Sequence, residues 1–594
     1  MDTINEKPQS DTLYNGSKFY KKLKSKAYKN KITRELYHLF FVSPGKDELV
    51  DDKEREQSSE VFIPYEGKRI NKIIIDVIPP FKPNFLDTVQ QTRIWLEKTA
   101  NKLHNTSSRK HIKKLLYLKE GDILDAYNTA DNERLIRELP YIKDAQFIPI
   151  LVMGSPELVD LYLLVKDQFS WGIDLDIGSI TSTSLELFNQ NMYGRGHEIK
   201  AGFEYNSDKS KNWGYLASYK VKNIKKTHIS ALLAFKNNYK RKSVKLEAEQ
   251  LFESYMTRYA GGLSLSTTQR SKKIKANDPV LNKEPLDFNS GSLWLGQAFK
   301  MKSKKKYTKS RLFTTIGASL IKFQKRPEVD KDLNRFFHNN RSYLTSITLN
   351  QVQFYKSNLI YNFGRTEDIP YGFLMQITTG FEDSEFCDRK YLAFEYQRAT
   401  HFNKSQIYFF TKMALGGYFK KDRYEQGTFI FQNKFIGRLR KSGRYRYRNF
   451  GALNYTLGIR RFPEEFITLN STDGIRGYSS DEASGTQKLS LQLENIAFTP
   501  YMAAGFRFAF FSFADIGVIG SNQHQPLKND YYYGLGCGIR LSNENLVFKT
   551  IELRFVVYPK APSDFTSPQY RMTGEDRPKF SKFEVGRPKV IDFE

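Results

Sequence analysis

Cysteine is nearly absent from this chain of 594 residues, which contains only Cys387 and Cys537. Two cysteines allow at most one bridge, so no disulfide framework is expected to hold the fold. Tryptophan and histidine are also scarce, with four and eight residues, and the histidines show no metal-ligand spacing. Because a nucleotide-binding loop, a nucleophile elbow and a pair of catalytic carboxylates are all missing, the sequence indicates neither an enzyme nor a cofactor.

Long apolar runs are missing as well. No segment approaches the roughly 18 consecutive apolar residues that a membrane-spanning helix needs. A transmembrane β-barrel escapes this requirement, because residues that face lipid alternate with residues that face the lumen. Residues Met1 to Ser17 lack the apolar core of a signal peptide. If the chain is an exported barrel, we expect its export signal or lipobox cysteine to have been removed.

What the chain has in excess is basic charge, with a formal net charge of +28. An excess of Lys and Arg is the electrostatic footprint of nucleic-acid binding. Here, however, the charge is dispersed along strand and turn segments, and no zinc-finger spacing accompanies it. Basic loops that face anionic lipid or lipopolysaccharide headgroups explain the excess more simply. We therefore expect outer-membrane lipids and lipopolysaccharide as partners, and no nucleic acid.

Residues 169–559 read as one strand pattern after another, separated by polar turns. At roughly 24 residues per strand and connection, this length predicts about 16 strands of a transmembrane antiparallel β-barrel. Alternation is clearest near the end, where one face of a strand carries Ile551, Leu553, Phe555 and Val557 and the other carries Glu552, Arg554 and Tyr558. In the strand before it, Cys537 is placed on the lipid face. Inward charges are costly in a dry core but not in a wet lumen, so a membrane barrel is favoured over a soluble β-sandwich.

Residues 61–168, ahead of the barrel, predict a compact βααββ unit. The expected elements are a strand over 69–77, a helix that Asn105 opens and Gly121 stops, a second helix ending near Pro140, and strands over 146–152 and 159–165. Residues 1–60 predict a disordered N-terminus, a basic helix over 18–41 and a charged linker. The basic helix either lies on a membrane surface or packs against a neighbouring domain or partner. Residues 560–594 predict a C-terminal periplasmic extension that folds back under the barrel, plugs it or dangles.

The segment Asp473-Gly-Ile-Arg-Gly-Tyr478 and the downstream strand segment Phe513-Ala-Asp-Ile-Gly517 carry the strongest functional signal. A loop tip inside a narrow, partly dehydrated lumen needs a charge-assisted anchor, and a guanidinium supplies several donors to a carboxylate. Gly477 lets the backbone pass close to the barrel wall, and Tyr478 offers apolar area and a hydroxyl. We predict that Arg476 pairs with Asp515, with Glu494 as a second possible partner in the lumen.

These two segments resemble the BamA/TamA outer-membrane assembly superfamily, which combines POTRA domains with a surface-antigen-type barrel. In that family, the tip of a long extracellular loop folds back into the lumen and its arginine pairs with the Asp of Phe-x-Asp-x-Gly. The resemblance implies these roles for Arg476, Gly477, Tyr478 and Asp515. Residues 116–122 and 133–145 resemble a POTRA domain, a periplasmic polypeptide-binding module. The chain has room for one such domain, fewer than BamA or two-partner-secretion translocators carry.

The resemblance implies a bacterial outer-membrane protein that receives unfolded outer-membrane clients in the periplasm and inserts them through a lateral seam. Periplasmic or lipoprotein accessory subunits are further expected partners. The alternatives are a translocator similar to those of two-partner secretion, and a scaffold barrel of a larger envelope complex. The seam is predicted to pair the first strand with the last, through Gly172, Ile173, Asp174 and Leu175 on one side and Ile551, Glu552, Leu553 and Arg554 on the other.

Overall fold

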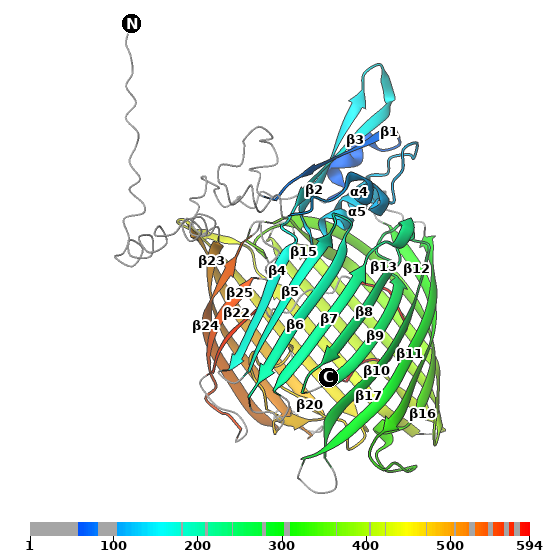
Figure 1. The fold of residues 1–594 in the computed structure, drawn as a ribbon, viewed down its shortest axis with the longest axis vertical. Coiled ribbons are helices and arrows are strands. Elements are labelled where there is room, and N and C mark those ends of the chain that lie inside the picture. Colours follow the sequence, from blue (N-terminus) through cyan, green and yellow to red (C-terminus); the bar gives the residue numbers. More distant parts are fainter. Residues whose placement is uncertain are drawn as a thin grey trace.

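A computed structural model shows a small α/β domain above one opening of a large β-barrel (Figure 1). Among the described residues, no helix has both the length and the apolar character needed to cross a membrane. The structure describes residues 58–80, 104–179, 182–207, 212–239, 241–275, 281–301, 309–360, 362–363, 365–402, 405–421, 423–470, 472–480, 482–503, 506–521, 529–543, 550–562, 569–574 and 583–593. The predicted basic helix over 18–41 lies outside these residues.

The small domain follows the predicted βααββ order. Its sheet has the strand order β1-β3-β2, in which β3 runs parallel to β1 and antiparallel to β2. The Asp125 carboxylate caps α5 by accepting from the backbone N–H of Asn128 at 2.8 Å, a favourable N-terminal cap. Ile112 and Ile136 from the two helices pack on the apolar face of the sheet. The elements are η1 (Glu60–Tyr65), β1 (Arg69–Ile78), α4 (Arg109–Leu115), α5 (Ala126–Arg137), β2 (Ile142–Val152) and β3 (Ser155–Asp167).

The barrel is a closed sheet whose neighbouring strands run antiparallel. Its strands are β4 (Trp171–Ser179), β5 (Ser182–Met192), β6 (His197–Asn206), β7 (Trp213–Val221), β8 (Ser230–Asn237), β9 (Arg241–Gln250), β10 (Tyr259–Lys275), β11 (Leu281–Met301), β12 (Ser310–Lys325), β13 (Asn340–Ser357), β14 (Glu367–Ser384), β15 (Asp388–Phe402), β16 (Ile407–Lys420), β17 (Arg423–Ile436), β18 (Arg440–Ser442), β19 (Tyr445–Ile459), β22 (Gln487–Ala503), β23 (Phe506–Gly520), β24 (Asp530–Ser542), β25 (Ile551–Val557) and β26 (Gln569–Gly574). Connections carry the short helices η2 (Ile224–Lys226) and η3 (Arg335–Phe337) and the two-stranded sheet β20 (Ile467–Thr468) and β21 (Ser484–Gly485).

The prediction of 16 strands is wrong. Within the described residues the barrel sheet contains 21 strand segments, including β18, a three-residue segment. The prediction assumed about 24 residues for each strand and connection. Several units of one strand plus its connection are shorter than this, because the connection has only two residues between β16 and β17 and three between β8 and β9. More strands therefore fit into the same length of chain.

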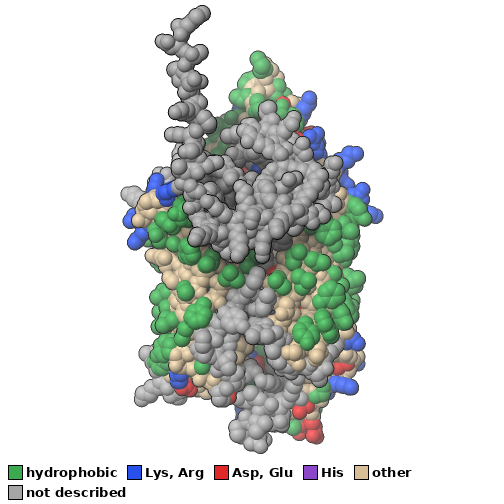
Figure 2. Space-filling model, turned by 60° about the vertical axis from the view of Figure 1, so that its left-hand side comes forward, with side chains coloured by type: hydrophobic (Ala, Val, Ile, Leu, Met, Phe, Trp, Pro, Cys, Tyr) green, Lys and Arg blue, Asp and Glu red, His purple; other side chains and the backbone are tan. Residues whose placement is uncertain are grey.

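The two faces of the barrel wall differ as the alternation predicts. On β25, the side chains of Leu553 and Phe555 are 41% and 48% exposed, whereas those of Glu552 and Arg554 are 1% and 3% exposed. Cys537 on β24 is exposed, as expected for the outer face. On the face drawn in Figure 2, hydrophobic and uncharged side chains cover the middle of the barrel, and charged side chains gather toward its two ends. This distribution is that of a wall with an apolar exterior and a polar interior.

The end of the chain differs from the prediction. The barrel does not stop at residue 559, because β26 pairs with β25 from Ile551↔Gly574 to Val556↔Gln569. The predicted seam between residues 171–177 and 550–558 is therefore wrong, since β26 lies between β25 and β4. The segment Gln569–Gly574 alternates over only six residues between Pro568 and Pro578, which is too short a pattern to signal a strand. Beyond it, residues 583–593 lie against inward-facing residues of the barrel wall, including Tyr391 and Ser292.

Candidate functional site

The connection between β19 and β22, residues 460–486, lies inside the barrel. Leu469, Ile475 and Tyr478 of this loop are buried and pack against inward side chains of β23 and β25. Its path is fixed partly by side chains of β22, because Gln492 Nε2 donates to the carbonyl oxygens of Thr472 (3.0 Å) and Gly474 (2.9 Å). The loop therefore covers the inner wall of β22 to β25.

Arg476 at the tip of this loop is held by two carboxylates of the wall. Its Nη2 and Nε donate to Asp515 Oδ1 and Oδ2 at 2.6 and 2.9 Å, and its Nη1 donates to Glu494 Oε2 at 2.5 Å. The backbone N–H of Arg476 also donates to Asp515 Oδ2 at 3.0 Å. The guanidinium lies over the Phe513 ring, 4.1 Å from its centroid. The structure thus brings together the three charged residues that the sequence singled out.

Gly477 and Tyr478 complete the loop tip. Gly477 has φ of +78°, a left-handed conformation that glycine adopts without strain. A Cβ at this position would lie 2.7 Å from the Tyr558 hydroxyl. That hydroxyl donates to the carbonyl oxygen of Arg476 at 2.8 Å, so a side chain at residue 477 would disturb the contact. The Tyr478 ring packs edge-on against Tyr558, with 5.8 Å between centroids.

The ion pair continues along the wall into a network of alternating charges. Arg540 on β24 donates to Glu494 at 2.8 and 3.0 Å and to Glu552 Oε2 at 2.8 Å. Arg554 lies 3.3 Å from Glu552 Oε1. Arg476, Arg540 and Arg554 thus face Glu494, Asp515 and Glu552, and the three positive and three negative charges balance. Such balance is needed because a buried charge without a partner is strongly destabilising.

Sequence analysis missed Arg540, although a signal was present. Alternation placed Cys537 on the outer face of β24, and the same alternation places residue 540 on the inner face. Glu552 and Arg554 were assigned to the seam, but they belong to this buried network. Ile551 and Leu553 pair with β24 and β26, not with β4. Gly172, Ile173, Asp174 and Leu175 lie on β4 and pair with β5.

The sheet closes between β4 and β26, and this junction is short. Within the described residues its register contains a single Cα pair, Met572↔Ile177. The adjoining pairing of β4 with β5 runs from Trp171↔Asn189 to Ser179↔Ser182, and that of β25 with β26 covers six successive pairs. Among the described strands, the β4–β26 junction therefore has the shortest registered pairing of the wall, and a pairing with fewer backbone hydrogen bonds separates more readily.

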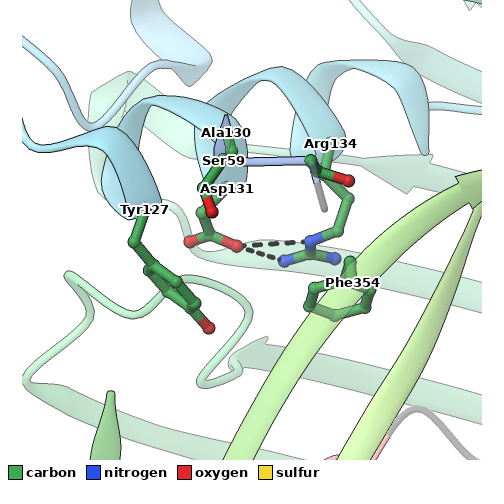
Figure 3. A pocket seen from close by; sticks show the side chains of 7 residues that line it. Ser59, Tyr127, Ala130, Asp131, Arg134 and Phe354 are labelled. Atoms are coloured by element: carbon green, nitrogen blue, oxygen red, sulfur yellow. Dashed lines mark hydrogen bonds and ion pairs between the residues drawn. The ribbon is translucent and has the colours of Figure 1, made fainter. Parts of the chain in front are cut away.

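Helix α5 of the small domain lies across the barrel opening and contacts β13 and β14 at the strand ends that border this opening. Arg137 Nε and Nη2 donate to the two Asp368 oxygens on β14 at 2.7 and 3.0 Å, and both side chains are almost fully buried. Figure 3 shows Asp131 and Arg134 of α5 paired above Phe354 of β13. The Arg134 guanidinium lies 4.4 Å from the centroid of that ring. The small domain is therefore fastened to the barrel by buried ion pairs.

A cavity of about 280 Å³ separates α5 from the barrel interior. One side is lined by Tyr127 and Asp131 of α5, and the floor includes residues 583–586 near the end of the chain. Acidic and basic side chains both line it, including Glu253, Lys309 and Arg311. Within the described residues, no group of three or more His, Cys, Asp or Glu side chains is placed to hold a metal ion.

No protein-family model matches the chain, and no curated protein matches it. Among solved structures, the chain is similar to BamA from Haemophilus ducreyi lacking POTRA domains 1–3, with 11% identity over 85% of this chain and 84% of that one and a TM-score of 0.37. It is also similar to CdiB from Acinetobacter baumannii (10% identity, 85% and 73% covered, TM-score 0.41). CdiB from Escherichia coli gives 10% identity, 86% and 76% covered, and a TM-score of 0.44.

Proposed function

We propose that the chain is a bacterial outer-membrane barrel that assembles client proteins in the membrane through the β4–β26 junction, as BamA/TamA-type factors are expected to do. The observation that carries the proposal is the single pair registered at this junction in the described part of the chain, where the rest of the wall is paired over longer stretches. An unpaired strand edge in lipid is costly, so an opened junction offers its backbone groups to an incoming strand. The small βααββ domain, in the role of a POTRA domain, receives the client on the periplasmic side.

Passage through the lumen, the translocator alternative, is less favoured by the same structure. The loop over 460–486 covers the inner wall on one side, and residues 583–593 contact it on the other. Helix α5 lies across the opening. A polypeptide moving along the barrel axis would have to displace all three, including the buried Arg476 network. Exit of the client into the membrane through the junction requires that one short strand pairing separates and leaves the Arg476 network in place.

Locking the junction tests the proposal. Cysteines at Met572 and Ile177, which are registered Cα partners, are introduced after Cys387→Ser and Cys537→Ser remove the native thiols. The matched control places cysteines at Leu185 and Phe203, registered partners on β5 and β6 that are both exposed on the outer face. Purified protein in lipid vesicles is then mixed with an unfolded outer-membrane barrel protein, and client folding is followed by gel mobility before and after reduction.

We expect oxidation of the Met572/Ile177 pair to stop client folding, and a reductant to restore it. The control pair should leave client folding unchanged, because β5 and β6 remain paired in either case. Undisturbed folding with the junction locked would contradict assembly at the seam. If Arg476→Ala also opened a large ion conductance, the translocator alternative would replace the proposal.

A further inference from the structure

Residues 583–593 bind the inner wall of the barrel through apolar side chains spaced two or three residues apart. Phe583, Val585 and Pro588 are buried, whereas Glu584, Arg587 and Lys589 are exposed. Phe583 and Val585 pack with inward apolar residues of the wall such as Phe410, and Val590 and Ile591 pack with Leu344 and Tyr391. The apolar side chains therefore face the wall, whereas the charged side chains are exposed, although the Arg587 guanidinium still reaches Ser292 on the wall.

Three inward-facing glycines on separate strands receive this segment. A Cβ on Gly317 of β12 would lie 3.1 Å from Pro588, and one on Gly416 of β16 would lie 3.0 Å from Ile591. A Cβ on Gly458 of β19 would lie 2.5 Å from the Phe593 ring. Each glycine thus leaves room for one side chain of the segment. Together the three positions form a groove that crosses the strands of the inner wall.

Polar contacts fix the segment in this groove without any strand pairing. Arg587 Nη1 donates to Ser292 Oγ at 2.6 Å, and the backbone N–H of Ile591 donates to the Tyr391 hydroxyl at 2.7 Å. Asn350 Nδ2 donates to the carbonyl oxygen of Phe583 at 2.8 Å. The Arg461 guanidinium lies 4.3 Å from the centroid of the Phe593 ring. These contacts come from side chains of the wall, so the segment can leave without breaking the backbone ladders of the barrel.

We propose that this groove is a binding site for a polypeptide segment with apolar side chains spaced two or three residues apart, and that residues 583–593 occupy it as a built-in competitor of the client. The proposal rests on the proposed function for the identity of the ligand, an unfolded client segment. It follows from the geometry because the wall recognises side-chain spacing and shape through glycine gaps and supplies few sequence-specific polar contacts. The first residues of the segment also line the cavity under α5, through which a client arriving from the small domain would enter.

A peptide-binding measurement tests the groove directly. A variant that ends before residue 583 is purified in detergent, and a fluorescent peptide with the sequence of residues 583–593 is titrated against it by anisotropy. We expect saturable binding to the shortened variant and at least tenfold weaker binding to the full chain, whose groove is occupied. A peptide carrying Ile591→Asp and Phe593→Asp should bind at least tenfold more weakly. Equal binding of the two peptides, or no binding of either, would overturn the proposal.

Full-length variants keep the test decisive if the shortened chain does not fold. Gly317→Val fills the gap that holds Pro588 and should expel the segment, so that trypsin cleaves after Lys589 at least tenfold faster. The control Gly291→Val lies on the neighbouring strand β11, where a Cβ would meet only Leu265 and Leu320 at 3.4 Å or more. Equal cleavage of the two variants would overturn the proposal.

The client assay separates this inference from the proposed function. The disulfide variant Gly317→Cys with Pro588→Cys, in the background without native thiols, fixes the segment in place. We expect slower client folding when this bond is oxidised and recovery after reduction. If the peptide binds but the disulfide does not affect client folding, the groove would be a peptide-binding site without a role in client folding. Absence of peptide binding would remove the site, whatever the junction-locking experiment shows.

Discussion

Replacing Arg476 by methionine tests how the lumen loop is held, because it removes the guanidinium and keeps an unbranched apolar side chain of similar length. Asp515, which is fully buried, would then keep only the backbone N–H of residue 476, at 3.0 Å. Glu494 would lose less, since Arg540 still donates to both of its oxygens. Breaking a buried pair by removing one partner costs about 3–5 kcal/mol. Most of this cost should therefore fall on Asp515.

The measurement is native-state hydrogen exchange of the loop. The backbone N–H of Ile475 donates to Leu469 within the loop at 3.0 Å, so its exchange reports loop opening. A loss of about 3–5 kcal/mol corresponds to faster exchange by roughly two to more than three orders of magnitude. The amides of β13, which lie on the other side of the barrel from the Arg476 network, provide the internal reference.

A double-mutant cycle decides whether Asp515 is the main partner. Asp515→Asn removes the unpaired charge, so adding it to Arg476→Met should cost at least about 2 kcal/mol less than in the native chain. Glu494→Gln should show a smaller coupling with Arg476→Met, because Arg540 remains beside it. Additive effects of Arg476→Met and Asp515→Asn, within about 0.5 kcal/mol, would refute the assignment of Asp515 as the anchor.

Two further predictions concern the small domain, namely its attachment to the barrel and the dependence of its stability on pH. Asp368→Asn removes the carboxylate that accepts two hydrogen bonds from Arg137. Hydrogen bonds to a charged group contribute about 1.5–3 kcal/mol, so this substitution should speed hydrogen exchange of the α5 amides by roughly tenfold or more. Asp76→Asn, whose partner Arg109 is exposed, is the control and should change exchange little. Burial, with smaller contributions from His197 and Lys114, lowers the pKa of His111 from its ordinary 6.5 to about 4. Because the unfolded state then binds the proton more readily, the free energy of unfolding should fall as the pH falls from about 6.5 toward 4 and be constant above that window. Proteolysis of the domain at pH 7.5 and pH 5 measures this, and the same pH response in His111→Gln would show that another group is responsible.

Local alternation predicted the face of each residue well, and long-range pairing poorly. The inward positions of Glu552 and Arg554 and the outward position of Cys537 follow from a period of two along single strands. The contact of Arg476 with Asp515 could be named because both flanking segments are distinctive. Neither the number of strands nor the closing partner of β4 is encoded in such local patterns. They depend on turn lengths and on β26, whose six residues are too short a pattern to stand out in a tail punctuated by prolines.

The groove for residues 583–593 could not be predicted for a related reason. Gly317, Gly416 and Gly458 are far apart in the sequence, and each alone reads as an ordinary glycine in a strand. Only the closed sheet places them on one path along the inner wall. The spacing of Pro588, Ile591 and Phe593 has meaning only relative to that path. Within the tail itself, prolines and charged residues interrupt any longer regular pattern, so no helix or strand is predicted there.

The strand number also sets a requirement for filling the interior. The diameter of a barrel grows roughly linearly with its number of strands, so each additional hairpin enlarges the space that the chain has to occupy. In this barrel the loop over 460–486 lines β22 to β25, and the C-terminal segment lines the wall from β11 to β19. The circumference of this barrel and the segments that fill its lumen are therefore matched to each other. A barrel with one hairpin fewer would have no room for residues 583–593. A barrel without those residues would enclose a wider water-filled space beside the same loop.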